Sequence, residues 1–168
     1  MKQIFIFILF LLLLGCGNII KNKQGSTKFN CPRVFFSSED RTYIDNGISL
    51  DDILIKAELN NFAINTQCQH QENIAVIPLD ILIVAKPMDN LEESLLFFPV
   101  YISLLDANDK ILETQYFSVS GLMNKNPETN SFIESDITDR LQIITQHLET
   151  SKLVLGFMFD KEKRNLLN

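Results

Sequence analysis

The chain has 168 residues, of which 46% are hydrophobic and 21% are charged, and its formal net charge at pH 7 is −6. This length is enough for one compact domain with a sizeable hydrophobic core. Acidic residues outnumber basic ones by 21 to 15, and nucleic-acid binding is not expected because phosphates require clustered Lys and Arg.

The N-terminal segment has the pattern of a signal peptide. Lys2 precedes an uninterrupted apolar run over residues 4–14, which ends at the small residue Gly15. A membrane-spanning helix needs about 20 apolar residues, and Asn18 and Lys21 prevent an extension of this run. The segment is therefore expected to be a cleaved signal rather than a transmembrane anchor. An ordinary secretory signal cleaved before Lys21 is the simpler alternative.

The residues Leu13-Leu14-Gly15-Cys16 resemble the lipobox of bacterial lipoproteins, although a smaller or β-branched residue is usual at the position of Leu14. The resemblance implies that the Cys16 thiol takes a diacylglyceryl group, that cleavage follows Gly15, and that the freed amine is acylated. Two or more acyl chains give stable anchoring. The expected partner of Cys16 is thus the membrane, with a mature chain of 153 residues on a lipid anchor.

Residues 16–30 are expected to form the lipidated Cys and a flexible tether. Lys21, Lys23 and Lys28 are the charged residues of this stretch, whereas residues 31–168 carry 11 basic and 21 acidic groups. The lysines either contact anionic headgroups or simply keep the tether soluble. Gly17 stands where an Asp would retain an enteric-type lipoprotein in the inner membrane. An outer-membrane location facing the periplasm is therefore expected.

If Cys16 is acylated, Cys31 and Cys68 remain as an even pair in an oxidising compartment. This arrangement predicts one disulfide. Two separate buried thiols are the alternative.

The folded domain is expected to span residues 31–168. A first strand over 31–36 contains Pro32, which suits an edge, and a turn is expected at Asp45-Asn46-Gly47. From residue 53 the apolar positions are odd-numbered, and after Asn60-Asn61 they are even-numbered. Because the side-chain period of a strand is two, this change of phase predicts a bulge at Asn60-Asn61.

The middle of the chain predicts three long strands. Residues 74–85 are almost continuously apolar, which is typical of a central strand covered on both faces, and Asp80 within them needs a partner if it is buried. Residues 95–105 and 111–119 predict a hairpin joined by a four-residue turn at residues 106–109.

The C-terminal part is less regular. Ile133, Ile137, Leu141 and Ile143 alternate as in a strand, whereas Ile137, Leu141, Ile144 and Leu148 also fit one face of a helix. We favour the strand, because the neighbouring elements are strands. Residues 152–159 predict a final strand, after which Asp160 is expected to cap a short helical tail ending at Asn168.

These elements predict an all-β fold, an antiparallel β-sandwich of immunoglobulin-like architecture. The domain start Cys31-Pro32-Arg33-Val34, the later Cys68, and Gly156-Phe157 resemble a group of small uncharacterised alphaproteobacterial envelope lipoproteins. Those proteins typically end in Gly-Phe-Gln-Leu, where this chain has Gly156-Phe157-Met158-Phe159. The resemblance implies fold and envelope location but no activity.

Candidate sites for chemistry are few. Cys68, His70 and Glu72 include metal-ligand types, but their spacing matches no closed four-ligand pattern, and a disulfide would consume Cys68. His147 and Ser151 lie close together outside any nucleophile motif. The pair Glu92-Glu93 lacks the opposed second acid of a glycosidase. No catalytic residue, metal or cofactor is therefore expected.

The segment Phe97-Phe98-Pro99 has two interpretations. It either fills the core or exposes an apolar edge for a partner strand, and core filling is favoured. We expect a lipid-anchored, non-catalytic envelope protein that acts in protein interaction or envelope maintenance. The alternative is a small-ligand carrier or hydrolase with a site assembled only in three dimensions.

Overall fold

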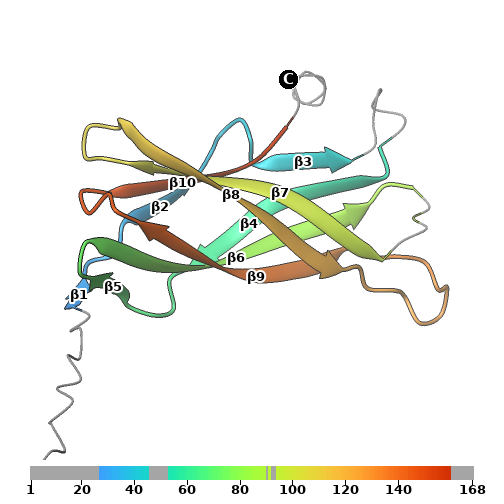
Figure 1. Cartoon of the computed structure of the whole chain (residues 1–168). Coiled ribbons are helices and arrows are strands. Elements are labelled where there is room, and N and C mark those ends of the chain that lie inside the picture. The colour runs from blue at the N-terminus through green and yellow to red at the C-terminus, as the bar shows by residue number, and fades with distance from the viewer. Residues whose placement is uncertain (1–26, 46–52, 90, 92–93, 160–168) are drawn as a thin grey trace, which may run out of the picture.

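The computed structural model describes residues 27–45, 53–89, 91 and 94–159. They form ten strands and no helix (Figure 1). The strands are β1 (Thr27–Phe29), β2 (Arg33–Phe36), β3 (Thr42–Asp45), β4 (Ile55–Ala63), β5 (Cys68–Gln71), β6 (Ile74–Pro87), β7 (Leu95–Leu105), β8 (Ile111–Leu122), β9 (Ser135–Thr145) and β10 (Lys152–Phe157).

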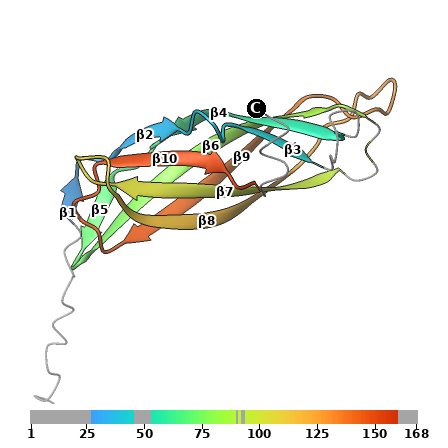
Figure 2. The ribbon, with the colours of Figure 1, turned by 90° about the horizontal axis from the view of Figure 1, so that it is seen from above.

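The strands form two sheets that stack as layers (Figures 1 and 2). In the first sheet β6 is central: β9 pairs along one edge, while β4 and β5 pair in succession along the other. β3 then flanks β4, and β1 flanks β5. The second sheet has the order β2-β10-β7-β8, in which only the β2–β10 pair is parallel. The predicted all-β sandwich is confirmed, whereas its immunoglobulin-like character stays a prediction.

The hydrophobic core lies between the sheets. Along β6 the odd-numbered side chains from Ala75 to Ala85 are buried, whereas the even-numbered ones from Ile74 to Val84 are half-buried. The prediction of a strand covered on both faces was therefore wrong. β6 has neighbours on both edges, but only its inner face meets a second layer. Apolar side chains on its outer face produced the continuous apolar pattern.

The predicted bulge is confirmed in β4. Leu59 pairs with Ile83, but Asn61 pairs with Leu82, so that Asn60 is the extra residue. The bulge turns Phe62 inward, and its ring meets the edge of Phe36 at a centroid distance of 5.2 Å. The sequence pattern thus located the residue at which the inward-facing positions change from odd-numbered to even-numbered.

The predicted hairpin is also confirmed, with a turn one residue longer than expected. The connection between β7 and β8 is residues 106–110, and the Asp106 carboxylate accepts the backbone N–H groups of Asn108 and Lys110 at 2.8 and 3.0 Å. On the inner face of β7, Val100, Ile102 and Leu104 are completely buried.

The segment that fits both a strand and a helix forms strand β9, which confirms the predicted strand. Its odd-numbered residues from Ile137 to Thr145 are buried or half-buried on the inner face, whereas Ile144 on the outer face is 50% exposed. The helical interpretation required Ile144 and Leu148 on the buried face, and both are exposed. The final strand is confirmed as β10, which ends at Phe157 rather than at the predicted residue 159. Its side chains Leu153, Leu155 and Phe157 are completely buried.

The predicted tether was too long at its C-terminal end, because residues 27–29 form β1 and pair with β5. The Phe29 ring stacks on His70 at a centroid distance of 4.0 Å and packs against the core. An apolar contact and the edge of β5 therefore order this polar stretch. The predicted signal peptide, the turn at Asn46-Gly47 and the helical tail lie outside the described residues.

The two ends of the sandwich differ in what they carry. We call the end with β1, the β5–β6 connection and the β7–β8 turn the proximal end. We call the opposite end, where β6 and β8 finish and β7 and β9 begin, the distal end (Figure 1).

Candidate functional site

The predicted disulfide joins Cys31 and Cys68, whose Cα atoms are 5.4 Å apart. Cys31 lies where the chain crosses from β1 in the first sheet to β2 in the second, and Cys68 begins β5. The backbone N–H of Cys68 also donates to the Cys31 sulfur at 3.2 Å. The bond therefore fixes the crossing at the proximal end. Cys16 and Glu92-Glu93 lie outside the described residues.

The geometry does not assemble the metal ligands considered from sequence. Cys68 is bonded to Cys31, and His70 stacks on Phe29. The Nε2 atom of His70 is buried without a hydrogen-bond partner in the described part of the chain. Within that part, no three His, Cys, Asp or Glu residues are grouped as a metal site would require.

The two residues considered for hydrolysis are not paired with each other. His147 Nδ1 lies 3.3 Å from a Glu149 carboxylate oxygen, whereas the Ser151 hydroxyl is buried and bonded to no described group. A hydrogen bond from its own backbone N–H, followed by the bond with His147, lowers the pKa of Glu149. The hydrogen bond that joins nucleophile and base in a hydrolase is thus not formed between Ser151 and His147 in this structure.

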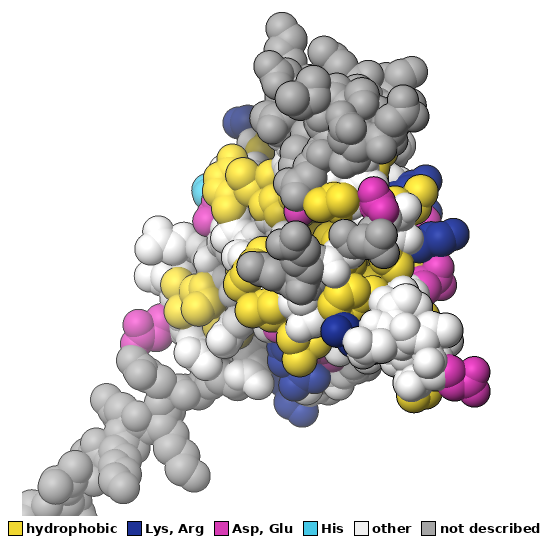
Figure 3. All heavy atoms as spheres, turned by 90° about the vertical axis from the view of Figure 1, so that its right-hand side faces the viewer, with side chains coloured by type: hydrophobic (Ala, Val, Ile, Leu, Met, Phe, Trp, Pro, Cys, Tyr) yellow, Lys and Arg dark blue, Asp and Glu magenta, His cyan; other side chains and the backbone are white. Residues whose placement is uncertain are grey.

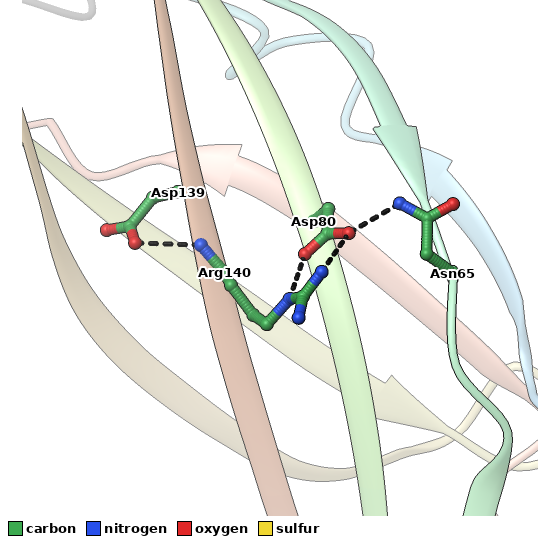
Figure 4. Close-up of polar contacts among 4 residues, drawn as sticks. All are labelled: Asn65, Asp80, Asp139 and Arg140. Carbon is green, nitrogen blue, oxygen red and sulfur yellow. Dashed lines mark hydrogen bonds and ion pairs between the residues drawn. The ribbon is translucent and has the colours of Figure 1, made fainter.

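A polar cluster lies on the outer face of the first sheet (Figure 4). Asp80 on β6 is paired in register with Arg140 on β9, whose Nε and Nη2 donate to the two carboxylate oxygens at 2.5 and 3.0 Å. Asn65, in the segment after β4, donates to the same carboxylate at 2.5 Å. These bonds from Arg140 and then Asn65 hold the pKa of Asp80 below its usual 3.8.

The partner that Asp80 was expected to need is thus Arg140. The carboxylate stays ionised at neutral pH and has no proton to donate, so it does not suit general acid catalysis. The cluster instead links β6, β9 and the segment after β4.

A second polar contact lies beside Gly156-Phe157 and explains why position 156 is a glycine. Tyr101 on β7 donates from its hydroxyl to Asp40 at 2.6 Å, and its ring lies over Gly156 on the neighbouring strand β10. A Cβ atom at Gly156 would lie 2.6 Å from this ring, closer than carbon atoms pack. Only glycine fits there without a shift, while Phe157 enters the core beside Tyr43 and Phe98.

The distal end carries exposed apolar side chains. Five large hydrophobic residues in or beside the strand ends are between 41% and 64% exposed: Met88, Leu95, Phe97, Leu122 and Ile133. Figure 3 looks onto this end and shows hydrophobic side chains gathered at its centre. We call these five residues the distal surface.

A cleft of about 470 Å³ opens beside the distal surface. Two connections form it, one between β6 and β7 and the other between β8 and β9. It is lined by Pro87, Met88, Asp89, Leu91, Lys125, Asn130, Ser131 and Phe132. We call it the distal cleft.

The cleft has no signature in the sequence, because its two walls come from segments more than 30 residues apart. The segment Phe97-Phe98-Pro99 both fills the core and exposes an apolar side chain. Phe98 is 1% exposed and belongs to the core, whereas Phe97 is 61% exposed. β8 pairs with this part of β7, but the pairing of β10 starts only at Val100.

The fold and disulfide define the class of this protein as a disulfide-bonded β-sandwich domain. No protein-family model, curated protein or solved structure matches the chain. In the described ranges no helix combines the length and apolar character needed to cross a bilayer.

Proposed function

We propose that this protein is a lipid-anchored, non-catalytic component of a bacterial envelope that binds a protein partner through its distal surface. The anchor is proposed at Cys16, on the outer membrane and facing the periplasm. This part rests on the lipobox-like Leu13-Leu14-Gly15-Cys16 and on the short apolar run before it.

The observation that carries the binding role is the exposure of five large hydrophobic side chains at the distal end. Several exposed large apolar side chains at one end of a domain are typical of interaction surfaces, because removing apolar surface from water on binding lowers the free energy. β1 lies at the proximal end, where the proposed tether joins the domain. The distal surface is then directed away from the bilayer and toward the periplasm.

A photo-crosslinking amino acid placed at Met88 in the native envelope tests this role. We expect a discrete protein adduct from Met88, because its side chain is 53% exposed beside the distal cleft. The matched control is the same crosslinker at Ala107, an exposed position of the proximal β7–β8 turn. Equal adducts from both positions, or none from Met88, would contradict the proposal.

The volume of the distal cleft favours a small-ligand carrier as a second candidate. Small-molecule sites usually measure roughly 300–1,000 Å³, and the cleft has about 470 Å³. Native mass spectrometry of protein purified from the envelope distinguishes the two roles. A bound small molecule that is lost on Phe132→Ala would favour the carrier over protein binding.

A further inference from the structure

Strand β8 is a long edge strand of the second sheet. In the order β2-β10-β7-β8 it pairs with β7 on one side, and no described strand pairs with its other side. Figure 2 shows it at the border of this sheet. The unpaired N–H and C=O groups of an edge strand can pair with another chain, and proteins usually prevent this with charges, proline, bulges or a very short strand.

The register shows which backbone groups of β8 face outward. Pro99 and Leu105 of β7 accept backbone N–H groups from the residues that flank β10, so the odd-numbered residues of β7 bond toward β10 and the even-numbered ones toward β8. The β8 partners of these even-numbered residues are odd-numbered, as in the pair Val100–Phe117. Because bonding groups alternate between the two sides of a strand, the even-numbered residues of β8 direct theirs to the open edge.

The part of β8 over residues 114–122 lacks the usual blocking features. It contains no charged residue and no proline, and its register with β7 is continuous. β9, the long edge strand of the first sheet, contains Asp136, Asp139 and Arg140, and the Arg140 N–H donates to the Asp139 carboxylate at 2.7 Å (Figure 4). The other described edge strands, β1, β2 and β3, have only three or four residues. β8 is therefore the described edge best suited to pairing.

The charge of the domain limits where two copies can meet. Residues 31–168 carry 21 acidic and 11 basic groups, so that contact between most faces of two copies brings like charges together. Residues 114–122 form an uncharged stretch. When this stretch of one copy faces the same stretch of another, no like charges are opposed.

The uncharged stretch is also complementary to itself in size. Its midpoint is Ser118, and antiparallel pairing about this residue places Tyr116 opposite Ser120 and Thr114 opposite Leu122. The two largest exposed side chains, Tyr116 at 65% and Leu122 at 64% exposure, then each face a smaller one. The even-numbered residues, whose backbone groups point outward, face one another in this register. Such an interface, in which both copies use the same patch, is the commonest kind in homo-oligomers.

We propose that β8 pairs antiparallel with β8 of a second copy about a two-fold axis at Ser118, which joins the two four-stranded sheets into one. This interface is separate from the proposed partner site at the distal end. Because the paired strands run in opposite directions, the two distal surfaces lie at opposite ends of the pair and remain open to another partner.

Disulfide crosslinking of the full chain in the native envelope tests the proposal. In Ser118→Cys the two introduced thiols belong to directly opposite residues, whose Cα atoms are about 5.5 Å apart, within the range of about 4.4–6.8 Å that a disulfide requires. A mild oxidant should give a covalent dimer that reducing agent removes. The matched control is Ser120→Cys, which is exposed on the same strand. Its Cα atoms in the two copies would lie more than about 13 Å apart, so no dimer is expected.

A charge at the axis tests the pairing independently of that bond. Differently tagged chains that carry Tyr116→Cys and Ser120→Cys should form a mixed dimer, because these positions face each other. Ser118→Lys in both chains should abolish the mixed dimer, since lysine on an edge opposes pairing. Ser118→Thr should retain it, because threonine suits a strand. Position 118 is exposed, so unchanged thermal melting of both variants is the folding control.

Four results would overturn the inference. Equal dimer yields from Ser118→Cys and Ser120→Cys would indicate random collisions. No dimer from Ser118→Cys would exclude the pairing, and an adduct with a different protein in its place would assign the edge to another partner. A mixed dimer that survives Ser118→Lys would exclude contact at the axis. The crosslinker at Met88 reports on the distal end alone, so its outcome leaves the pairing of β8 unaffected.

Discussion

The proximal and distal ends of the sandwich differ in the contacts that their side chains make. At the proximal end the Cys31–Cys68 disulfide, the stacked Phe29 and His70, and the Lys152–Asp109 ion pair are contacts within the chain. At the distal end, large apolar side chains are exposed beside a cleft that carries Lys125. Exposed apolar side chains also occur at the proximal end, where Ile111 is 60% and Leu148 is 41% exposed. The two ends therefore differ mainly in the disulfide at one of them and in the cleft with its larger group of exposed apolar side chains at the other.

The comparison suggests a division of roles along the long strands. The proposed tether joins the proximal end, so that any pull from the membrane acts beside the disulfide. β6, which has 14 residues, connects this end to the distal cleft. The same strand therefore links the stabilised region to the proposed binding region.

The largest effect is expected from Cys16→Ala, which removes the proposed attachment of the proximal end. Unprocessed precursor should accumulate and acyl labelling should be abolished, because the thiol is the acceptor of the lipid. Immunoblotting and incorporation of labelled fatty acid measure these outcomes. Processed protein of normal mobility would favour an ordinary secretory signal.

The disulfide should dominate the stability of the proximal end. Its cysteines are 37 residues apart, and closing such a loop contributes about 4 kcal/mol on the chain-entropy model. Cys31→Ser and Cys68→Ser should each lower the free energy of unfolding by about 2–5 kcal/mol, and the two should not add. Denaturant unfolding measures the loss. Two reactive thiols in the denatured, oxidised protein would contradict the bond.

Leucine substitutions distinguish the core from the distal surface. Leu104 is fully buried and Leu122 is 64% exposed. Leu104→Ala should cost about 2–5 kcal/mol by leaving a cavity, whereas Leu122→Ala should change stability by less than about 0.5 kcal/mol. Denaturant unfolding gives both values. A cost for Leu122 close to that of Leu104 would mean that the distal side chains serve folding rather than binding.

Gly156→Ala tests the close contact between β10 and β7. The added Cβ would meet the Tyr101 ring at 2.6 Å, and such overpacking costs about 1–3 kcal/mol. Thermal and denaturant unfolding measure the loss. In a Tyr101→Ala background the same substitution should cost less, because the ring is gone. An unchanged cost in that background would assign the effect to the backbone.

The smallest effect is expected at Asp80, between the two ends. Arg140 lowers its pKa in the folded state, so its stabilisation is present above the unfolded pKa and is lost as the pH falls through the folded one. The melting temperature of Asp80→Asn should therefore lie below that of the wild type at pH 7, and the difference should shrink below about pH 4. Asp136→Asn, on the outer face of β9, is the control. A constant difference at all pH values would contradict the ion-pair explanation.

Much of the fold could be predicted from patterns within single segments. The alternation along β4 and β10 and the turn between β7 and β8 depend on neighbouring residues in the chain, because side chains of a strand alternate between two faces. The change of phase at Asn60-Asn61 located the bulge for the same reason. Counting cysteines was enough to pair Cys31 with Cys68, once Cys16 was assigned to the anchor.

Contacts between distant segments were decided only by the tertiary structure. β1 is three residues long and polar in its surroundings, and it is ordered by β5 and by the stack of Phe29 on His70. The apolar run of β6 was compatible with one covered face or two, since the pattern within a strand does not reveal how many layers pack against it. The distal cleft joins Met88 to Phe132 across two connections. The lipobox-like residues predict an anchor at Cys16 from a single segment, whereas the distal cleft exists only because the fold brings strand ends and connections from distant segments together.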